Sequence, residues 1–349
     1  MMIRTGIIGL GKMGISHAAI LGAHPDVDLV AVCDSSALVI DVFKKYSRFE
    51  VFTDYKKMID TMKLDALLIA SPTRFHVEMA AYALKNNIHL FCEKPLSLDF
   101  TEGNRLSVQA GMSKLVNQVG YHNRFLGTFN EAKRLLSTGL IGEIYHFSAE
   151  SYGPVVLKEK GGTWRSDRTA GGGCLYDYAS HTIDLINFLL GKPVRVSGTQ
   201  LKFIFSRDVE DAVYSNLTLE SGLSGQLSVN WSDESHRKMS TQMTILGKKG
   251  KIIADATELK IFISEDNKAA GLTKGWTLKD LTTLTPNVNF YLRGEEYSLQ
   301  IDYFVQCIKT KQPADKSSFE NASQTDEVIS LLIRDNASNH QHAKNNIRG

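Results

Sequence analysis

A glycine pattern close to the start of the chain limits its possible folds more than any other feature. The string Gly9-Leu10-Gly11-Lys12-Met13-Gly14 follows the apolar run Ile3–Gly9 and opens a segment with helical character. Between a strand and a helix, the first glycine forms a tight turn, the second lets a pyrophosphate approach the backbone, and the third lets helix and strand pack closely. We therefore expect a dinucleotide-binding βαβ unit. Its expected cofactor contacts are Gly9, Leu10, Gly11, Lys12, Met13 and Gly14.

An acidic residue follows at the distance that such a unit requires. Asp34 ends the next apolar run, Leu29–Asp34, twenty residues after Gly14. A carboxylate in this position accepts hydrogen bonds from the adenosine ribose and repels a 2′-phosphate. Two serines, rather than an arginine, come next in the chain. The pattern favours NAD over NADP, and the alternative is a structural glycine turn followed by a surface aspartate.

The first part of the chain alternates short apolar runs with amphipathic stretches, which is typical of a doubly wound parallel sheet. Strands are expected at Ile3–Gly9, Leu29–Asp34, Ala66–Ala70, Ile88–Cys92 and Leu115–Gly120. Helices are expected at Gly14–Gly22, Leu38–Tyr46, Tyr55–Met62, Phe75–Asn86 and Thr101–Ala110. Because 349 residues exceed what one hydrophobic core usually supports, we expect a second domain after this one.

The pattern changes after Arg124. Strict alternation, clearest where Leu227, Val229 and Trp231 are separated by polar residues, indicates half-buried antiparallel strands. Further strands are expected at Glu143–Tyr152, Thr241–Gly247 and Lys251–Asp255, and helices at Phe129–Ser137, Glu296–Thr310 and Glu320–Asn336. The second part of the chain is therefore expected to be an α/β domain with an antiparallel sheet.

Composition restricts the partners. The net charge of +2 gives no electrostatic reason to expect a nucleic acid or a membrane surface. The four cysteines form no C-x-x-C pair, which argues against a disulfide framework and a structural zinc and favours a reducing cytoplasm. The apolar run at the N-terminus is broken by glycines before it reaches the length of a signal segment or a membrane span. We expect a cytoplasmic protein that acts on a small molecule.

Two further segments follow strands of the expected parallel sheet, at the carboxyl edge where such sheets bind ligands. Ser71 and Thr73 come after the strand Ala66–Ala70 and are candidates for cofactor contact. His76, close behind them, is interpreted as a residue of the first helical turn. Glu93-Lys94-Pro95 ends the next strand. It is either a functional group at the sheet edge or a surface salt bridge with a turn-forming proline.

The stretch Ala170–Asp184 leaves three interpretations open. Asp177, His181 and Asp184 recur at i, i+4 and i+7, so they share one helical face and form a metal site, an acid–base pair or ordinary packing. No second cluster of His and Cys supports a metal. The apolar residues that follow are typical of an amphipathic helix docked on a core. No metal is therefore expected.

These motifs together resemble those of the Gfo/Idh/MocA family of oxidoreductases, named for glucose-fructose oxidoreductase and inositol dehydrogenase. The resemblance covers nearly the whole chain. It implies an NAD-binding Rossmann domain at residues 1–123. It also implies a substrate-binding and oligomerisation α/β domain at residues 124–349, with a large, mostly antiparallel open sheet. Relatives commonly form dimers or tetramers, so a homodimer or homotetramer is expected. The residues that carry the resemblance are the glycine string, Asp34, Glu93-Lys94-Pro95, Gly171-Gly172-Gly173, Asp177, His181 and Asp184.

The resemblance also implies residue roles. Lys94 matches the lysine that contacts the substrate hydroxyl near the nicotinamide, His181 matches the acid–base residue, and Asp177 matches the carboxylate that holds the substrate or the histidine. Other family segments add Glu93, Trp164 and Arg165 on the cofactor side, where Lys94 is also expected to contact the cofactor. They add Tyr121 and Asn123 beside the substrate. Arg124 and Arg165 are equally compatible with ion pairs at the surface or between domains. The role of Asp184 stays open between packing and substrate contact.

This constellation predicts an NAD(P)-dependent oxidoreductase acting on CH–OH donors. The expected reaction is oxidation of a secondary hydroxyl of a sugar, a cyclitol or a nucleotide-linked sugar. The cofactor takes the hydride, and His181 takes the proton with help from Lys94 and Asp177. The resemblance leaves three alternatives: an NAD-dependent glycosidase with transient substrate oxidation, a double-bond reductase of the dihydrodiol or biliverdin type, and a non-catalytic NAD-binding regulator.

Overall fold

The computed structural model describes the backbone of residues 2–159 and 161–346 and the side chains of residues 2–159 and 161–339. The chain forms two compact units. The first contains the residues up to His122 and the later segment Asn287–Asp326, and the second contains Asn123–Pro286 and the residues from Glu327 onward. The chain therefore does not divide into two continuous segments that meet after residue 123, because the segment 287–326 packs with the first unit.

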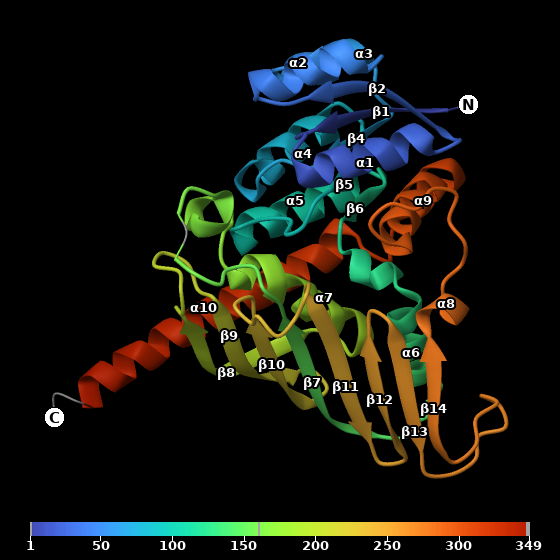
Figure 1. Ribbon diagram of the computed structural model, residues 1–349, viewed down its shortest axis with the longest axis vertical. Coiled ribbons are helices and arrows are strands. Elements are labelled where there is room, and N and C mark those ends of the chain that lie inside the picture. Colours follow the sequence, from blue (N-terminus) through green and yellow to red (C-terminus); the bar gives the residue numbers. More distant parts are fainter. Residues whose placement is uncertain (1, 160, 347–349) are drawn as a thin grey trace. The chain divides into compact units, whose positions relative to one another are not determined.

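The first unit is built on a six-stranded parallel sheet (Figure 1). The strand order β3-β2-β1-β4-β5-β6 is the order of a Rossmann fold, which confirms the expected doubly wound sheet. The strands are β1 (Ile3–Ile8), β2 (Val27–Cys33), β3 (Glu50–Phe52), β4 (Ala66–Ile69), β5 (His89–Cys92) and β6 (Asn117–Val119). Strand β3 was not expected from the sequence, because three partly exposed residues are too few to show a period.

Helices cover both faces of this sheet. They are α1 (Lys12–Ala23), α2 (Ala37–Tyr46), α3 (Tyr55–Met62), α4 (His76–Lys85), α5 (Phe100–Met112) and α9 (Glu295–Thr310). Helices α1 and α9 share one apolar cluster with alternate strand residues such as Ala66 and Leu68. Helices α3, α4 and α5 share the opposite cluster with Leu67 and Ile69. Two of these helices begin at aspartates that cap them: Asp54 accepts the Lys56 N–H at 2.9 Å and Asp99 accepts the Thr101 N–H at 2.7 Å.

The second unit is built on an eight-stranded sheet with the order β14-β13-β12-β11-β7-β10-β9-β8. Its neighbouring strands run antiparallel except for β7 and β10, which are parallel. This confirms the expected large, mostly antiparallel sheet. The strands are β7 (Ile144–Tyr152), β8 (Pro193–Lys202), β9 (Ala212–Leu219), β10 (Ser224–Asn230), β11 (Ser240–Gly247), β12 (Gly250–Asp255), β13 (Glu258–Ile263) and β14 (Gly275–Asp280).

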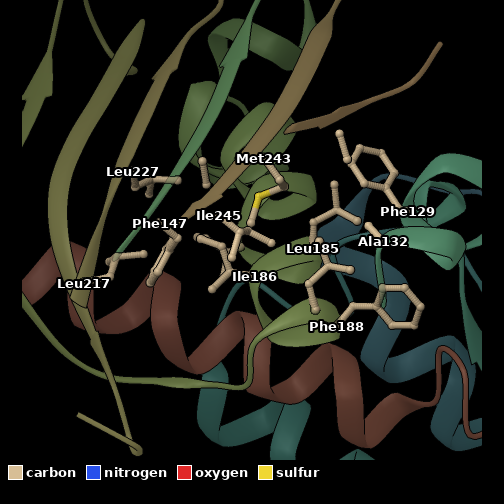
Figure 2. Packing of buried hydrophobic residues seen from close by; sticks show 14 of the residues in the cluster. Phe129, Ala132, Phe147, Leu185, Ile186, Phe188, Leu217, Leu227, Met243 and Ile245 are labelled. Atoms are coloured by element: carbon tan, nitrogen blue, oxygen red, sulfur yellow. The ribbon is translucent and has the colours of Figure 1, made fainter. Parts of the chain in front are cut away.

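One face of the eight-stranded sheet carries the core of the second unit. Helices α6 (Gly127–Ser137) and α7 (Ser180–Leu189) pack there, and Figure 2 shows Leu185 and Ile186 of α7 facing Phe147, Met243 and Ile245 of the sheet. The same strands expose residues on the other face, since apolar and polar positions alternate. The remaining helices are the short α8 (Leu281–Leu284) and α10 (Phe319–Asn346), which contributes to both units. Among the described residues, none of the helices combines the length and the hydropathy needed to cross a membrane.

Candidate functional site

The glycine loop of the first unit has the geometry that its pattern predicts. Gly9 has a φ of +89°, and a Cβ there would lie 2.6 Å from the carbonyl group of Ala70. A Cβ at Gly14 would overlap the carbonyl oxygen of Gly9. At Gly11, by contrast, no atom of the described residues beyond its two chain neighbours lies within 4 Å of the place a Cβ would take. The loop therefore leaves open space at the position where the fingerprint places a pyrophosphate.

The groups around this space suit an NAD molecule. Helix α1 begins at Lys12 directly after the loop, and Gly11 supplies no side-chain cap to the backbone N–H groups of its first turn. The carboxylate of Asp34 accepts the Leu10 N–H at 2.6 Å with one oxygen and the Ser36 N–H at 2.8 Å with the other. These bonds fix the carboxylate beside the loop, and each oxygen keeps acceptor capacity for ribose hydroxyls.

The loop after β4 is held from inside the unit. Thr73 is buried, and the Ser71 hydroxyl lies 3.4 Å from the sulfur of Met79. His76 is also buried, and its two ring nitrogens lie 2.9 Å from the carbonyl oxygens of Pro95 and Ser71. It begins helix α4, as expected, and it also joins the β4 loop to the β5 loop.

Lys94 lies in the turn that follows β5. At the start of this turn, the Glu93 N–H donates to the Ile69 carbonyl oxygen at 2.8 Å. The Lys94–Pro95 peptide bond is cis. The Glu93 carboxylate accepts a hydrogen bond from His17 Nε2 at 2.6 Å and another from the Lys94 N–H at 3.2 Å. Burial raises the pKa of Glu93, but the hydrogen bond from His17 and the nearby positive charge of Lys94 hold it below its ordinary value.

An aromatic pair lies close to the same carboxylate. The rings of His122 and Tyr297 stack with centroids 4.6 Å apart, and the charge of Glu93 acts on both groups. Burial lowers the pKa of His122 to about 4, and burial together with the Glu93 charge raises the pKa of Tyr297 to about 12. Tyr297 belongs to the segment 287–326, which the sequence analysis assigned to the other domain.

In the second unit, three of the residues expected at the site lie together. Arg165 Nε donates to Asp177 Oδ2 at 3.0 Å, and its guanidinium carbon lies 4.5 Å from the centre of the Trp164 ring. Asp177 lies in a π-helical turn, Leu175–Ala179, that leads into α7, and both Asp177 and His181 are buried. Such π turns are rare and occur often at functional sites. The regular α-helical spacing assumed from the sequence does not hold across this turn.

The glycine run before this turn packs against protein groups. A Cβ at Gly172 would overlap the carbonyl oxygen of Arg165, and a Cβ at Gly173 would overlap the carboxylate of Glu210. Glu210 is buried, accepts the Leu175 N–H at 2.9 Å and lies 3.6 Å from Arg168. Burial raises the pKa of Glu210. Glu210 therefore holds the start of the π turn.

Asp184 is a partner in a buried ion pair. The guanidinium of Arg124 donates to both of its carboxylate oxygens at 2.8 Å, and the two side chains are 4% and 1% exposed. Arg124 and Asp184 thus form an ion pair inside the second unit. Within the described part of the chain, no three His, Cys, Asp or Glu side chains form a group that would hold a metal ion.

The structure distributes the expected site residues over both units. The first unit carries the glycine loop, Asp34, Ser71, Thr73, Glu93, Lys94 and Tyr121, and the second carries Asn123, Trp164, Arg165, Asp177 and His181. Tyr121 is fully buried in a core cluster of the first unit, and Asn123 is also buried. Sequence reasoning gave no role to His17, Glu210 and Tyr297. Of these, only His17 had a local signal, a histidine three residues after the last fingerprint glycine.

Comparison with family models decides the relationship. The model of the oxidoreductase family with an NAD-binding Rossmann fold matches residues 3–121, and the model of the GFO/IDH/MocA C-terminal domain matches residues 129–253. Together these matches cover more than half of the chain. The chain belongs to the Gfo/Idh/MocA family. As a member it is an oxidoreductase whose N-terminal domain has the NAD-binding fold, as the resemblance implied.

Several relatives of this Gfo/Idh/MocA protein are named as dehydrogenases. D-glucoside 3-dehydrogenase of Escherichia coli (strain K12) is 30% identical over 55% of this chain and 55% of its own length, so the match spans about half of that relative. Myo-inositol 2-dehydrogenase of Thermotoga maritima is 27% identical over 72% of this chain and 75% of its own. Levoglucosan dehydrogenase, solved with NADH and levoglucosan, shares the fold with a TM-score of 0.86 and 20% identity, over 97% of this chain and 98% of that one.

Proposed function

We propose that this protein is an NAD-dependent dehydrogenase that oxidises a secondary hydroxyl of a sugar, a cyclitol or a nucleotide-linked sugar. The observation that carries the proposal is the arrangement of the first unit. The open glycine loop, Asp34 and Lys94 all follow strands of the parallel sheet at their carboxyl ends. A member of an NAD-binding family that has a cation at this edge can stabilise an alkoxide beside the cofactor.

The proposed cofactor contacts come from both units. The loop Gly9–Gly14 and the N-terminus of α1 bind the pyrophosphate, and Asp34 binds the adenosine ribose. Ser71, Thr73 and Glu93 lie farther along the same edge, and Trp164 and Arg165 add contacts from the second unit. NAD, when bound, accepts the hydride. The negative charge of Asp34 supports NAD over NADP, because it repels a 2′-phosphate.

The proton chemistry falls to residues of this chain. We assign His181 the proton of the substrate hydroxyl, because an imidazole titrates near neutral pH. Lys94 stabilises the developing negative charge on the oxygen. Asp177 binds a neighbouring hydroxyl or orients His181, and its carboxylate forms an ion pair with Arg165. Tyr121 and Asn123 border the substrate.

The second unit has a proposed role in assembly as well as in substrate binding. The face of its sheet opposite the helices exposes Trp276 and Leu278 of β14. Apolar groups in that position suit contact between two copies, so a homodimer or homotetramer is proposed. Four free, buried cysteines support a reducing compartment, and we propose the cytoplasm. Light scattering of the purified chain measures its oligomeric state, and a monomer at micromolar concentration would contradict the proposed homodimer or homotetramer.

Turnover assays test the activity. The absorbance of reduced nicotinamide is followed with NAD or NADP against inositols, free aldoses, glucosides and UDP-sugars. A dehydrogenase yields net NADH with at least one of these. If NAD binds and none of them drives reduction, the proposal fails. Consumption of a glycoside without net NADH would indicate a glycosidase, and oxidation of NADH by an unsaturated acceptor would indicate a double-bond reductase.

A Lys94→Met variant tests the assigned cation. Loss of a group that stabilises a developing oxyanion typically lowers kcat by about 10²–10³-fold. NADH affinity, measured by fluorescence titration, should stay within about threefold, because Lys94 acts on the substrate oxygen. Lys85→Met is the matched control, since Lys85 is an exposed lysine at the end of α4. Full activity of the Lys94 variant would refute its role.

A further inference from the structure

Two buried histidines hold the turn that carries Lys94, one on each side of it. We propose that His17 and His76 are positioning residues that fix the Glu93-Lys94-Pro95 turn between helices α1 and α4. The inference rests on the proposed function, in which Lys94 acts on the substrate hydroxyl. It adds two residues that act through Lys94 and that touch neither the substrate nor the cofactor.

The first contact comes from helix α1. His17 is completely buried, and its Nε2 lies 2.6 Å from Glu93 Oε1. Because a carboxylate accepts hydrogen bonds, Nε2 carries the hydrogen of this contact. The ring packs edge-on against Phe91 at 5.3 Å between centroids, which sets its position on the sheet. Glu93 is thereby tied to the same helix whose first turn follows the glycine loop.

Glu93 passes this constraint on to Lys94. Its second oxygen, Oε2, accepts the backbone N–H of Lys94 at 3.2 Å. The carboxylate lies against the backbone of Gly120, where an added Cβ would come within 3.1 Å of Oε2. A chain of two contacts therefore runs from the His17 ring through Glu93 to the Lys94 backbone.

The second contact comes from helix α4. His76 is 1% exposed, and its Nδ1 lies 2.9 Å from the carbonyl oxygen of Pro95, the residue after Lys94. Its Nε2 lies 2.9 Å from the carbonyl oxygen of Ser71. Both partners accept hydrogen bonds, so the neutral ring that burial favours donates to one carbonyl, and we assign that hydrogen to Nδ1, which faces Pro95. His76 thereby anchors the far side of the turn to helix α4.

Such anchoring matters because of the length of the lysine side chain. The four-carbon stem of Lys94 is flexible, so the place of its ammonium group depends on how firmly its backbone is held. A misplacement of about 1 Å can lower a rate by about 10²-fold. Loss of either histidine contact should therefore lower kcat while cofactor binding is largely kept.

Variants that keep or remove one donor test this directly. Gln places an N–H close to the position of His Nε2, and Asn places one close to His Nδ1. His17→Gln should keep the bond to Glu93, whereas His17→Phe removes it. His76→Asn should keep the bond to Pro95, His76→Gln should keep the contact with Ser71, and His76→Leu removes both. The two amide variants of His76 separate the effect of the contact with Pro95 in the lysine turn from the effect of the contact with Ser71 in the β4 loop.

The expected result is a split between turnover and binding. His17→Phe, His76→Leu and His76→Gln should lower kcat by about 10–100-fold, with the Kd of NADH within about threefold of the parent protein. His17→Gln and His76→Asn should retain kcat within about fivefold. The positioning role is refuted if kcat falls only in proportion to NADH binding. It is also refuted if His17→Gln and His76→Asn are as impaired as the other three variants.

A second measurement needs no substrate, so it separates failure of this inference from failure of the proposed function. Hydrogen exchange of the Lys94 amide, followed on the full-length protein with NADH, should accelerate about tenfold in His17→Phe. His89→Leu is the control: His89 lies at the other end of β5 and accepts the Val116 N–H at 2.9 Å. Unchanged Lys94 exchange in a folded His17→Phe protein would overturn the inference, and so would equal acceleration in His89→Leu.

Discussion

Two acidic side chains of this protein are buried for different purposes. Asp184 accepts hydrogen bonds from Nε and Nη2 of the Arg124 guanidinium, so it forms an ion pair within the second unit. Glu93 instead accepts from a histidine and from the next peptide N–H, so it supports a turn that carries a cation. Burial is expensive for either carboxylate, and each is compensated by donors that the local sequence does not reveal.

The Arg124–Asp184 pair leads to a prediction about stability. Asp184→Asn leaves the Arg124 charge buried without its counter-ion, which typically costs about 3–5 kcal/mol. Urea unfolding followed by circular dichroism measures this loss. The control is Arg207→Met, because its pair with Glu159 is 77% and 59% exposed and should contribute less than about 1 kcal/mol. Equal effects of the two variants would contradict the structural role of Asp184.

Asp34 leads to a prediction about cofactor choice. Asp34→Asn keeps an oxygen that can accept the Leu10 N–H but removes the negative charge. Like charges brought together cost several kcal/mol, so the preference for NAD over NADP should fall by about 10-fold or more. The ratio of kcat/KM for the two cofactors measures it. An unchanged ratio would show that the carboxylate does not face the 2′-position.

At the scale of elements, the π turn and the glycine run before α7 form one structural piece. Gly173 has a φ of +107°, and Glu210 fills the space beside it while accepting the Leu175 N–H. The loop before β9 therefore sets where the π turn begins. The π turn sets the direction of the Asp177 side chain, whose carboxylate accepts a hydrogen bond from Arg165. A short loop far away in sequence thus orients a proposed substrate residue.

Gly173→Ala should disturb this piece. The new methyl group would meet the Glu210 carboxylate, and the residue would keep an unfavourable positive φ, so a loss of about 2 kcal/mol or more is expected. Thermal unfolding measures the stability and kcat reports on the site. Gly111→Ala is the control, since no described residue outside its own helix and chain neighbours lies within 4 Å of the added group and it lies inside helix α5. A Gly173 variant as stable as the control would contradict this account.

At the scale of the whole molecule, the segment 287–326 completes the first unit. Ile301, Phe304 and Val305 of α9 pack into the cluster that α1 shares with the sheet. The same segment brings Tyr297 against His122. A chain that leaves the Rossmann unit and returns to it places distant residues in one core, so the stability of this unit depends on the late segment.

Acid should destabilise the protein through His122. Its pKa is about 4 in the folded unit and near the ordinary 6.5 when unfolded, so the unfolded state binds more protons between these values. Stability is therefore expected to rise with pH through this window and to be lost as pH falls from 6.5 towards 4. The loss is on the order of 2 kcal/mol for this partly buried ring. Urea midpoints measured from pH 4.5 to 7.5 record it.

His122→Phe identifies the group responsible. It keeps a ring to stack on Tyr297 and removes the titration, so the slope of stability against pH should become shallower. Some slope should remain, because burial also lowers the pKa of His76. An unchanged slope would assign the acid sensitivity to other groups.

The sequence by itself determined the Rossmann topology, the antiparallel second sheet and the family. The glycine string, the alternation of strands and helices, and the lysine triplet are local patterns, and their order along the chain was enough. It also placed the glycine string, Asp34, Ser71 and Lys94 just after strands that the structure contains. Three-residue β3 and the π turn escaped it, because short or irregular elements leave no period to detect.

Only the tertiary structure determined which charged side chains pair with each other. It assigned Asp184 to Arg124, Asp177 to Arg165 and Glu93 to His17, and it placed the segment 287–326 in the first unit. Each of these contacts joins residues that are separated along the chain and become neighbours through packing. A charged side chain in a sequence shows that a partner is needed once it is buried, and the fold selects which one.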